Sequence, residues 1–412
     1  MKLKNVALVL VSFLIGIVFV GCDGEEKKPP REEGEVVVIS YNVDADESTL
    51  PKRGPMMTKL INTLYPDSVG FQEARPGWLS HLKENLKDYD YVGVSADGEY
   101  PQPHSFGNYI FYLKDKYEVV HSGYYWHSDT PLVPSLYPGA DCNRYCVWAI
   151  FKNKETGTMY AHINTHLNWL PNKKATEAGA RMVRSMVNVL EEMGLPVFCT
   201  GDFNDQENSN TYQVMTEGSI GDTKFLAEES MNVGTYPHYG DYDPYKENPN
   251  VIDYIFVTEE TVDVLNYRVL DDRPGGEYIS DHFGIYVKAK ILTDKIGEVF
   301  IDTINPVFPE DAYLKVSRIT SRDAVLTFSS AQDDFYVDSY EVKVINEDGK
   351  VVFSRELSSG LYHGEIKDEF ELKIIRGRLD PGQKYTVEIT ATDVFGNRTE
   401  VPLKTEFVSA ES

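Results

Sequence analysis

Short runs of apolar and β-branched residues alternate with amphipathic segments from Glu35 to about Ile291, and this alternation restricts the possible folds. Such runs predict buried strands at 35–41, 68–72, 109–113, 147–151, 160–165, 197–200, 252–257 and 285–291. Apolar residues at helical spacing predict helices at 55–64, with Pro55 in the first turn, and at 78–86. A longer helix is expected to end at Gly194. Strands and helices in mixed order predict a layered α/β domain.

The pattern changes after Ile291, where helical periodicity disappears. Alternating polar and apolar residues predict strands at 324–329, 339–346, 351–355, 369–375 and 384–393. Short strands separated by turns suggest a β-sandwich. The segment Leu379-Asp-Pro-Gly-Gln-Lys-Tyr385 resembles the turn and tyrosine corner of fibronectin type III domains. This resemblance implies an immunoglobulin-like sandwich, a hydrogen bond between the Tyr385 hydroxyl and the backbone across the corner, and a spacer or docking role.

Two lysines precede an apolar run of fifteen residues, 6–20, which is short for a membrane span of about 20 residues and suits a secretory signal. The run ends at Phe19-Val20-Gly21-Cys22, which resembles a bacterial lipobox and implies acylation of Cys22. A plain signal peptide with an incidental cysteine is the alternative. Residues 23–34 are charged, contain two prolines and show no periodicity, so they are expected to form a solvated tether. A membrane-anchored protein of the bacterial cell surface, or one facing the periplasm, is therefore expected.

The chain is accordingly divided into a signal peptide at 1–21, a tether at 22–34, an α/β domain at 35–292, a linker at 293–306 and a β-sandwich at 307–412. Three cysteines remain, and an odd number leaves at least one free thiol. A disulfide between Cys142 and Cys146 across a tight loop remains open. Cys199, in an apolar run, is expected in the core.

The chain is strongly acidic, with 40 lysines and arginines against 65 aspartates and glutamates in 412 residues and a net charge of −25. About −16 of this charge falls within residues 35–292. General nucleic-acid binding is disfavoured, because it depends on basic residues that displace counterions from phosphates. An enzyme that handles phosphate through a metal ion is not excluded.

Polar side chains stand at the ends of the predicted strands of the α/β domain. They are Asn42, Gln72, Glu73, Asn164, His166, Asp202, Asn204, Asp253, Asp281 and His282. A single Asn or Asp after a strand is usually a turn former. A whole set of this kind is expected to converge at one edge of the sheets, where ligands bind in α/β folds. Carboxylate and amide oxygens are ligands for Mg²⁺ or Mn²⁺, and histidines add proton transfer.

Other hydrolytic signatures are missing from the sequence. It contains no G-x-S-x-G elbow, no G-x-x-x-x-G-K-[ST] loop and no C-x-x-C pair. Metal-assisted hydrolysis without a covalent intermediate is the chemistry that fits the polar set.

Six motifs occur in order: Ser40-Tyr-Asn-Val, Pro66-Asp-Ser-Val-Gly-Phe-Gln-Glu73, Asn164-Thr-His-Leu, Gly201-Asp-Phe-Asn, Ile252-Asp-Tyr-Ile and Ser280-Asp-His. Together they resemble the endonuclease/exonuclease/phosphatase superfamily, whose best-known member type is DNase I. The resemblance covers about 255 residues. It implies a four-layer α/β sandwich, in which two packed mixed β-sheets are flanked by helices.

The resemblance also implies roles for these residues. Glu73 would hold the metal, with Asn42 and Asp281 completing or adjoining its shell. The expected ion is Mg²⁺, with Mn²⁺ as the alternative and Ca²⁺ possible. The catalytic group is expected to comprise His166, Asp202, Asn204, Asp253 and His282.

Within that group, Asp202 would orient and deprotonate the attacking water, while Asn204 and His166 would bond phosphate oxygens. His282, paired with Asp253, would act as acid/base or stabilise charge. Which of Asp202 and His282 takes the proton of the water is left open.

Two further residues are expected on the substrate side. Arg144 resembles a phosphate-contacting arginine at the start of a strand, with an ordinary edge arginine as the alternative. Tyr109 resembles a substrate-side residue, with a core aromatic as the alternative. Trp126 is expected to pack in the core and His127 to lie on the surface.

The sequence favours a small or lipid-derived phosphoester as substrate, cleaved at the cell surface by a monomer. It lacks the inositol 5-phosphatase form of the fourth motif and the long apolar hairpin of membrane-inserting sphingomyelinases. An extracellular endonuclease or exonuclease acting on nucleic acid is the alternative enzyme. A catalytically silent surface module for binding or adhesion is the alternative of another class.

Overall fold

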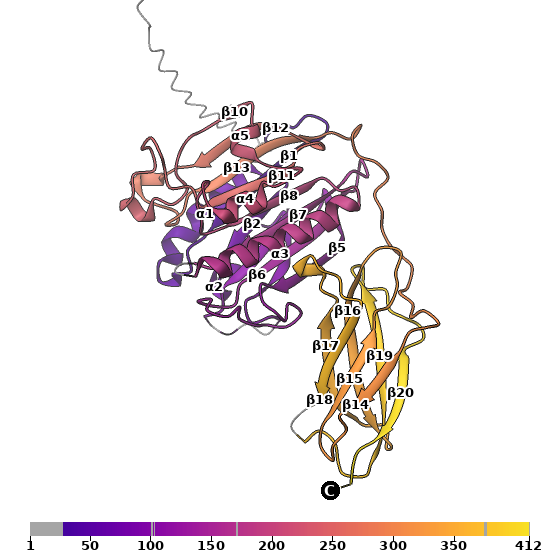
Figure 1. The fold of residues 1–412 in the computed structure, drawn as a ribbon. Helices are drawn as coiled ribbons and strands as arrows, with labels where there is room; N and C mark the ends of the chain where they lie inside the picture. Colours follow the sequence, from indigo (N-terminus) through magenta and orange to yellow (C-terminus); the bar gives the residue numbers. More distant parts are fainter. Residues whose placement is uncertain (1–27, 100–101, 103, 170–171, 375–376, 412) are drawn as a thin grey trace, which may run out of the picture.

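A computed structural model describes residues 28–99, 102, 104–169, 172–374 and 377–411. The expected signal peptide and Cys22 lie outside these residues. The chain forms an α/β lobe that ends with strand β13 (Gly284–Ile291) and an elongated C-terminal lobe made of strands (Figure 1). No helix in the described ranges is long and apolar enough to cross a membrane.

The α/β lobe contains two mixed sheets. The order of the first is β10 (Glu229–Ser230), β12 (Val262–Leu270), β13, β1 (Glu35–Asn42), β2 (Ser68–Gln72), β4 (Gly107–Leu113) and β3 (Tyr89–Ser95). The order of the second is β5 (Tyr117–Trp126), β6 (Tyr145–Asn153), β7 (Met159–His166), β8 (Val197–Asp202), β11 (Asp253–Thr258) and β9 (Ile220–Asp222). Strand β1 runs parallel to β2, and β7 parallel to β8, whereas β13 and β11 are antiparallel to their neighbours.

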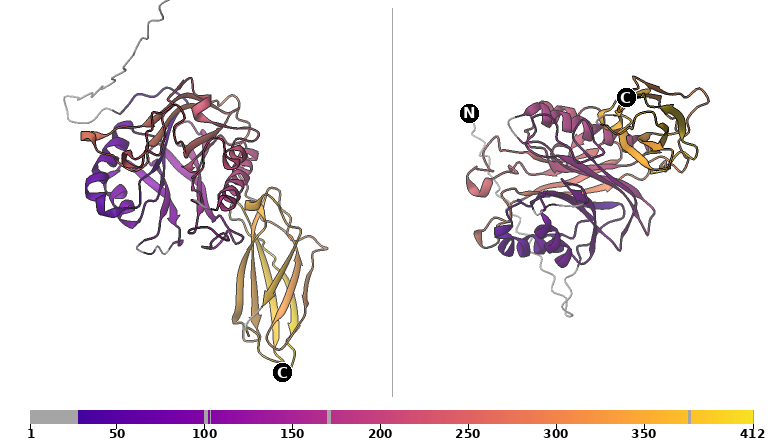
Figure 2. Two further views of the ribbon diagram at one scale, coloured as in Figure 1. Left: turned by 60° about the vertical axis from the view of Figure 1, so that its left-hand side comes forward. Right: turned by 90° about the horizontal axis from the view of Figure 1, so that it is seen from below.

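Helices cover the outer faces of the two packed sheets (Figure 2). Helices α1 (Leu50–Leu64) and α2 (Pro76–Asn85) pack on the first sheet, where they share one core cluster with it. Helix α3 (Lys173–Glu192) and the short α4 (Asn210–Met215) pack on the second sheet. A four-residue helix, α5 (Thr223–Leu226), and the 3₁₀ turns η1 (Glu47–Thr49), η2 (His238–Gly240) and η3 (Pro274–Gly276) lie in the connections. Mixed sheets flanked by helices agree with the expected α/β sandwich.

The local predictions failed in two ways. Helix α1 begins five residues before Pro55, because Pro51 occupies its first turn, where a missing N–H costs nothing. Strands β3 and β5 were not predicted: they are the edge strands of the two sheets, and their half-exposed, mixed polar sequences lack an apolar run. Strands β9, β10 and β12 were also missed.

The C-terminal lobe contains two antiparallel sheets around one apolar cluster. The smaller sheet has the order β14 (Leu314–Ser317), β15 (Ala324–Ser329) and β18 (Glu369–Ile374). The larger has the order β17 (Val351–Ser358), β16 (Val337–Asn346), β19 (Lys384–Asp393) and β20 (Leu403–Val408). Strands β14 and β20 were not predicted. The backbone N–H of Asp380 donates to the Tyr385 hydroxyl at 2.7 Å, so this hydroxyl is bonded to the backbone of the turn before β19.

The two lobes are in direct contact along α3 and β5. The turn η4 (Leu361–His363) inserts into the core cluster beneath α3, where the rings of Tyr362 and Tyr125 stack with centroids 4.2 Å apart. The Ser185 hydroxyl on α3 donates to the Leu361 carbonyl at 2.8 Å. Buried apolar contact of this kind predicts a defined arrangement of the lobes rather than a free tether.

Candidate active site

The register of the second sheet brings three of the predicted side chains to one level. Asp253, at the start of β11, lies opposite Asp202, at the end of β8. His166, at the end of β7, lies on the other side of Asp202. Because neighbouring strands are about 4.8 Å apart, this pairing places the three side chains at one edge of the sheet.

The first sheet contributes from the facing edge. Asn42 ends β1 opposite Gln72, and Glu73 follows directly with a left-handed backbone, φ 62°. A left-handed non-glycine residue costs about 1–3 kcal/mol and is typical of functional sites. The Ser280 hydroxyl donates to the Asn42 carbonyl at 2.7 Å, and this bond holds Asp281 and His282 beside β1.

Asp202 is the centre of the group. Its Oδ2 accepts from Asn42 Nδ2 at 3.0 Å and lies 3.3 Å from His166 Nε2 and 3.7 Å from His282 Nε2. Its Oδ1 accepts from the backbone N–H of Asn204 at 2.9 Å. The carboxylate is buried, so these partners determine where its oxygens point.

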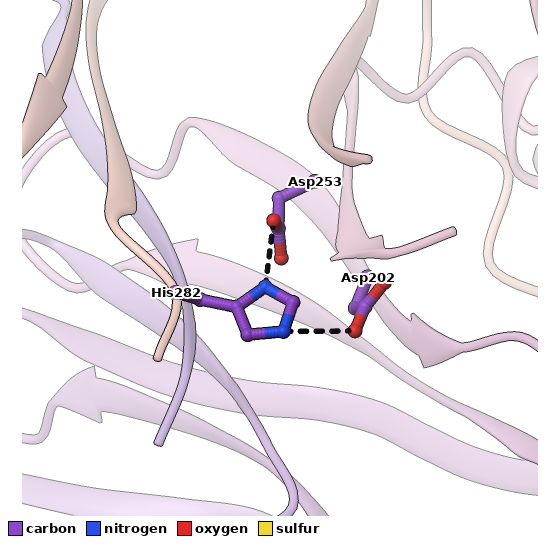
Figure 3. Close-up of side chains that lie close together, drawn as sticks. All are labelled: Asp202, Asp253 and His282. Carbon is purple, nitrogen blue, oxygen red and sulfur yellow. Dashed lines mark hydrogen bonds and ion pairs between the residues drawn. The ribbon is translucent and has the colours of Figure 1, made fainter. Parts of the chain in front are cut away.

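His282 lies between two carboxylates (Figure 3). Its Nδ1 is 2.9 Å from Asp253 Oδ2, and its Nε2 faces Asp202. Burial opposes a charge on this ring, but the neighbouring carboxylates Asp253, Asp202 and Asp281 outweigh it and raise the pKa of His282 well above its usual value. Burial and then Asp253 raise the pKa of Asp202. The site thus holds a protonated imidazole beside a carboxyl group that is poised to accept a proton.

The pKa of His166 is shifted in the opposite direction to that of His282. Burial, with a further contribution from Arg144, lowers the pKa of its ring well below the usual value, so the ring is neutral. Its Nε2 lies 3.0 Å from the amide nitrogen of Asn204, and its Nδ1 lies 4.0 Å from Glu73 Oε1. A neutral ring can donate one hydrogen bond, as its predicted role toward phosphate requires.

The acidic side chains of the site suit a divalent cation. Across the described ranges, no lysine or arginine forms an ion pair with Glu73, Asp202, Asp253 or Asp281. The ion-pair partners of the first three are His166 and His282. Burial and then the charges of Asp44 and Glu73 raise the pKa of Asp281, against the effect of His282. Carboxylate oxygens with no lysine or arginine beside them are suitable ligands for a hard cation.

The donors fall into two groups. Glu73 and Asp281 stand on the side of the first sheet, while Asp202, Asp253 and His282 offer donor atoms within 4.8 Å of one another. Asn42 turns its amide nitrogen to Glu73 Oε1 at 3.3 Å and its oxygen to the N–H of Asp44. Asn42 therefore donates hydrogen bonds to the carboxylates. To act as a metal ligand, its side-chain amide would have to rotate so that its oxygen faces the ion.

Arg144 is the predicted phosphate contact, and it precedes β6 on the site's side of the second sheet. Its guanidinium donates to Asp141 Oδ2 at 2.9 Å, and it is near enough to influence the pKa of His166. The Arg144 side chain is only 10% exposed and that of Asp141 is 34% exposed, so a contact from Arg144 to a substrate oxygen would require the guanidinium to turn away from Asp141.

Two other residues are placed differently. The Tyr109 ring is buried in the core against Tyr91, with centroids 5.7 Å apart, so the structure favours the core alternative for this residue. His127 was expected on the surface, but it is buried under α3 beside Gly179 and Leu167. Polarity alone suggested exposure, and the long helix covers it.

Sequence reasoning missed an aromatic segment above the site. The centroids of the Tyr236 and His282 rings are 4.7 Å apart, and the backbone N–H of His238 donates to the Asp281 carbonyl at 3.0 Å. Tyr239, Tyr242 and Tyr245 follow and are exposed. Four tyrosines within ten residues of a loop could have indicated this surface, because exposed aromatic clusters mark binding sites.

Gln72 and Asn164 have a structural role. Gln72 Nε2 donates to Asn164 Oδ1 at 2.8 Å between the sheets, and Asn164 Nδ2 donates to the carbonyls of Phe71 and Tyr109. These bonds join β7 of one sheet to β2 and β4 of the other. They hold the two edges of the site in register.

The sequence profile of the endonuclease/exonuclease/phosphatase family matches residues 39–282. The chain belongs to this family. Its members are hydrolases of phosphoesters that generally use a divalent metal, which agrees with the donor set described above. The remaining residues of the chain lie outside the matched region. No protein of the curated collection matches the chain.

Solved structures support the family assignment. A mannosyl-6-phosphatase of Bacteroides thetaiotaomicron is 32% identical, with a TM-score of 0.55 over 62% of this chain and 99% of that chain. An endonuclease/exonuclease/phosphatase family protein of the same species is 30% identical, with a TM-score of 0.56 over 62% and 98%. A family member from Beutenbergia cavernae is 18% identical, and with a TM-score of 0.50 over 91% and 99% it shares the fold over most of the chain.

Replacing Arg144 by alanine is expected to raise KM about 10-fold or more with a smaller effect on kcat, because a charged hydrogen bond to substrate is lost. Arg144→Lys should restore part of the affinity. Arg181→Ala, an exposed substitution on α3, is the matched control. Steady-state kinetics on a soluble phosphoester measures the effect. A loss confined to kcat would move Arg144 into the group that acts on the transition state.

Proposed function

We propose that the protein is a divalent-metal-dependent phosphoesterase that hydrolyses a phosphomonoester or phosphodiester by in-line attack of water. The observation that carries this proposal is the environment of Asp202, a buried carboxylate in contact with Asn42, His166 and the N–H of Asn204, and facing His282. A carboxylate that can exchange a proton, next to one charged and one neutral imidazole, suits phosphoryl transfer to water.

We assign each residue of the site a role in the hydrolysis. Glu73 and Asp281 would hold the ion, Mg²⁺ by preference, which when bound supplies positive charge to the phosphate oxygens. Asp202 orients the attacking water and accepts its proton. Asn204 and neutral His166 donate hydrogen bonds to phosphate oxygens. His282, held by Asp253, provides a fixed positive charge or the proton for the leaving oxygen.

The aromatic segment at Tyr236–Tyr245 supports a small substrate with a flat face. The half-buried Tyr236 ring lies beside His282, and the exposed Tyr242 ring packs next to Tyr236, with ring centroids 5.8 Å apart. The relative named as a mannosyl-6-phosphatase makes a sugar phosphate the first substrate class to test. The net charge supports the same choice, because residues 35–292 carry a net charge of about −16, which repels a long nucleic-acid duplex.

A second candidate, an extracellular nuclease, is favoured by the same exposed tyrosines, because nucleobases also stack on aromatic rings. A short single strand or a nucleotide would then be the substrate.

We also propose that the protein acts outside the cytoplasm as a monomer held to a membrane through Cys22. The support is the lipobox-like sequence and the charged tether. The C-terminal lobe is proposed to be a fibronectin type III-like spacer, an idea supported by its two sheets and by the bond to the Tyr385 hydroxyl.

The test is an assay of residues 23–412 on p-nitrophenyl phosphate, bis-p-nitrophenyl phosphate, mannose 6-phosphate, sphingomyelin, single-stranded oligonucleotide and plasmid DNA. Each substrate is tested with Mg²⁺, Mn²⁺, Ca²⁺ and EDTA. Hydrolysis of a small phosphoester that stops with EDTA and returns with Mg²⁺ or Mn²⁺ is the expected result. Cleavage of nucleic acid alone at physiological salt would favour the nuclease. Absence of metal-dependent hydrolysis throughout would favour a silent binding module.

A further inference from the structure

Three aspartates outside the active site converge where the two lobes meet. Asp302 belongs to the segment between β13 and β14, Asp333 to the loop between β15 and β16, and Asp393 ends β19. Each offers a carboxylate oxygen, and the three oxygens lie within 4.8 Å of one another. They come from three segments that are far apart in the sequence, so only the fold of the C-terminal lobe brings them together.

The cluster contains buried oxygens without partners. Asp302 is only 4% exposed, and its Oδ2 has no hydrogen-bond partner among the described residues. Both carboxylate oxygens of Asp333 are likewise buried without a partner in this part of the chain. No lysine or arginine in the described ranges forms an ion pair with Asp302, Asp333 or Asp393. Uncompensated carboxylates this close repel one another, and either a bound proton or a cation relieves the repulsion.

Backbone bonds hold the carboxylates in place. Asp302 Oδ1 accepts from the N–H of Ile304 at 2.7 Å. Asp393 Oδ1 accepts from the N–H groups of Phe395 and Asn397, both at 2.8 Å. Asn397 also links the two segments, because its Nδ2 donates to Asp393 Oδ2 at 2.7 Å and to the Asp302 carbonyl at 3.3 Å. The site is therefore pre-arranged by the backbone around it.

We propose that Asp302, Asp333 and Asp393 bind a Ca²⁺ ion at the junction of the two lobes. Ca²⁺ takes six to eight oxygen ligands about 2.3–2.6 Å away, so donors on opposite sides of the ion are up to about 5 Å apart. Three carboxylates from two connecting segments and a strand end provide the irregular oxygen shell that Ca²⁺ accepts, with water in the remaining positions. Sites of extracellular modules typically bind with Kd of about 10⁻⁴–10⁻³ M.

The ion would fix the arrangement of the lobes. Near Asp302, the N–H of Phe300 donates to the Met193 carbonyl at the end of α3, at 2.9 Å. Near Asp333, the Tyr336 hydroxyl donates to Glu192 at 2.6 Å. Next to Asp393, the Val394 carbonyl lies 2.7 Å from His121 Nε2 on β5. Each ligand thus stands one to three residues from a contact with the α/β lobe, at the junction seen below α3 (Figure 1).

The test compares residues 23–412 of the wild type, Asp333→Asn and the matched control Asp334→Asn, an exposed neighbour outside the cluster. Calorimetric titration with Ca²⁺ and thermal unfolding are measured after EDTA treatment. The wild type and Asp334→Asn should bind one Ca²⁺ that Asp333→Asn does not, and their Tm should rise by about 3 °C or more at saturation. In EDTA, Asp333→Asn should melt no lower than the wild type, because it carries one fewer repelling charge.

Glu73→Gln separates this site from the active site, since it should lose phosphoester hydrolysis but keep the Ca²⁺-dependent rise in Tm. Asp302→Asn serves as a second cluster variant if Asp333→Asn does not fold. Both cluster variants should retain hydrolysis with Mg²⁺ within about twofold of the wild type. The proposal is overturned if the wild type shows no such Ca²⁺ response, or if the cluster variants bind Ca²⁺ and gain stability as Asp334→Asn does.

Discussion

Replacing Asp202 by asparagine is expected to lower kcat by about 10³-fold, the largest effect of any single substitution in the site. The change removes a buried carboxylate that contacts both Asn42 and His166 and faces His282. An amide of the same shape cannot accept the proton of the attacking water, and it leaves the protonated His282 ring with less compensation. Because asparagine has the same shape as aspartate, the variant should remain folded while its kcat falls.

The measurement is kcat on a small phosphoester at saturating Mg²⁺, with circular dichroism as the check on folding. Asp263→Asn, an exposed substitution on β12, removes the same charge far from the chemistry and should leave kcat unchanged. A loss of less than about tenfold for Asp202→Asn would rule out Asp202 as the group that takes the proton.

His282→Ala is expected to cost at least about 10²-fold in kcat. The ring carries a positive charge between Asp253 and Asp202, so its removal deletes a charge that stabilises the developing oxyanion or a proton for the leaving oxygen. Asp253→Asn should cost less, because the ring remains. The two substitutions act on one unit, and the double variant should be little worse than His282→Ala alone.

Steady-state kinetics of the four proteins in this cycle checks the prediction, with His81→Ala on α2 as the histidine control. Additive losses would show that Asp253 acts independently of His282. An unchanged rate for His282→Ala would mean that the assignment of this residue is wrong.

Much of the candidate site could be predicted from the sequence. Asn42, Glu73, His166, Asp202 and His282 stand directly at or beside strand ends, where a run of apolar residues stops at a polar one. Hydrophobic patterning indicates where a buried strand stops, and strands of one sheet tend to stop along a common edge. That reasoning predicted convergence of these side chains, and the structure brings them together.

The failures have physical causes as well. Edge strands β3 and β5 have half-exposed sequences that resemble loops, because only one of their edges is paired. His127 is polar yet buried, since α3 packs over it. The loop at Tyr236–Tyr245 lies outside the predicted strands and helices. Its position over His282 follows from long-range bonds such as that between the N–H of Phe283 and the Thr235 carbonyl, at 2.7 Å.

The sequence by itself determined the layered α/β class, the change to an all-β lobe after Ile291 and the residue types of the active site, because these depend on local periodicity and on short motifs. Only the tertiary structure decided that Asp253 pairs across from Asp202, that Tyr109 faces the core and that Asp302, Asp333 and Asp393 share one position at the lobe junction. Strand register and lobe packing are set by contacts between distant segments. No local pattern of residues contains that information.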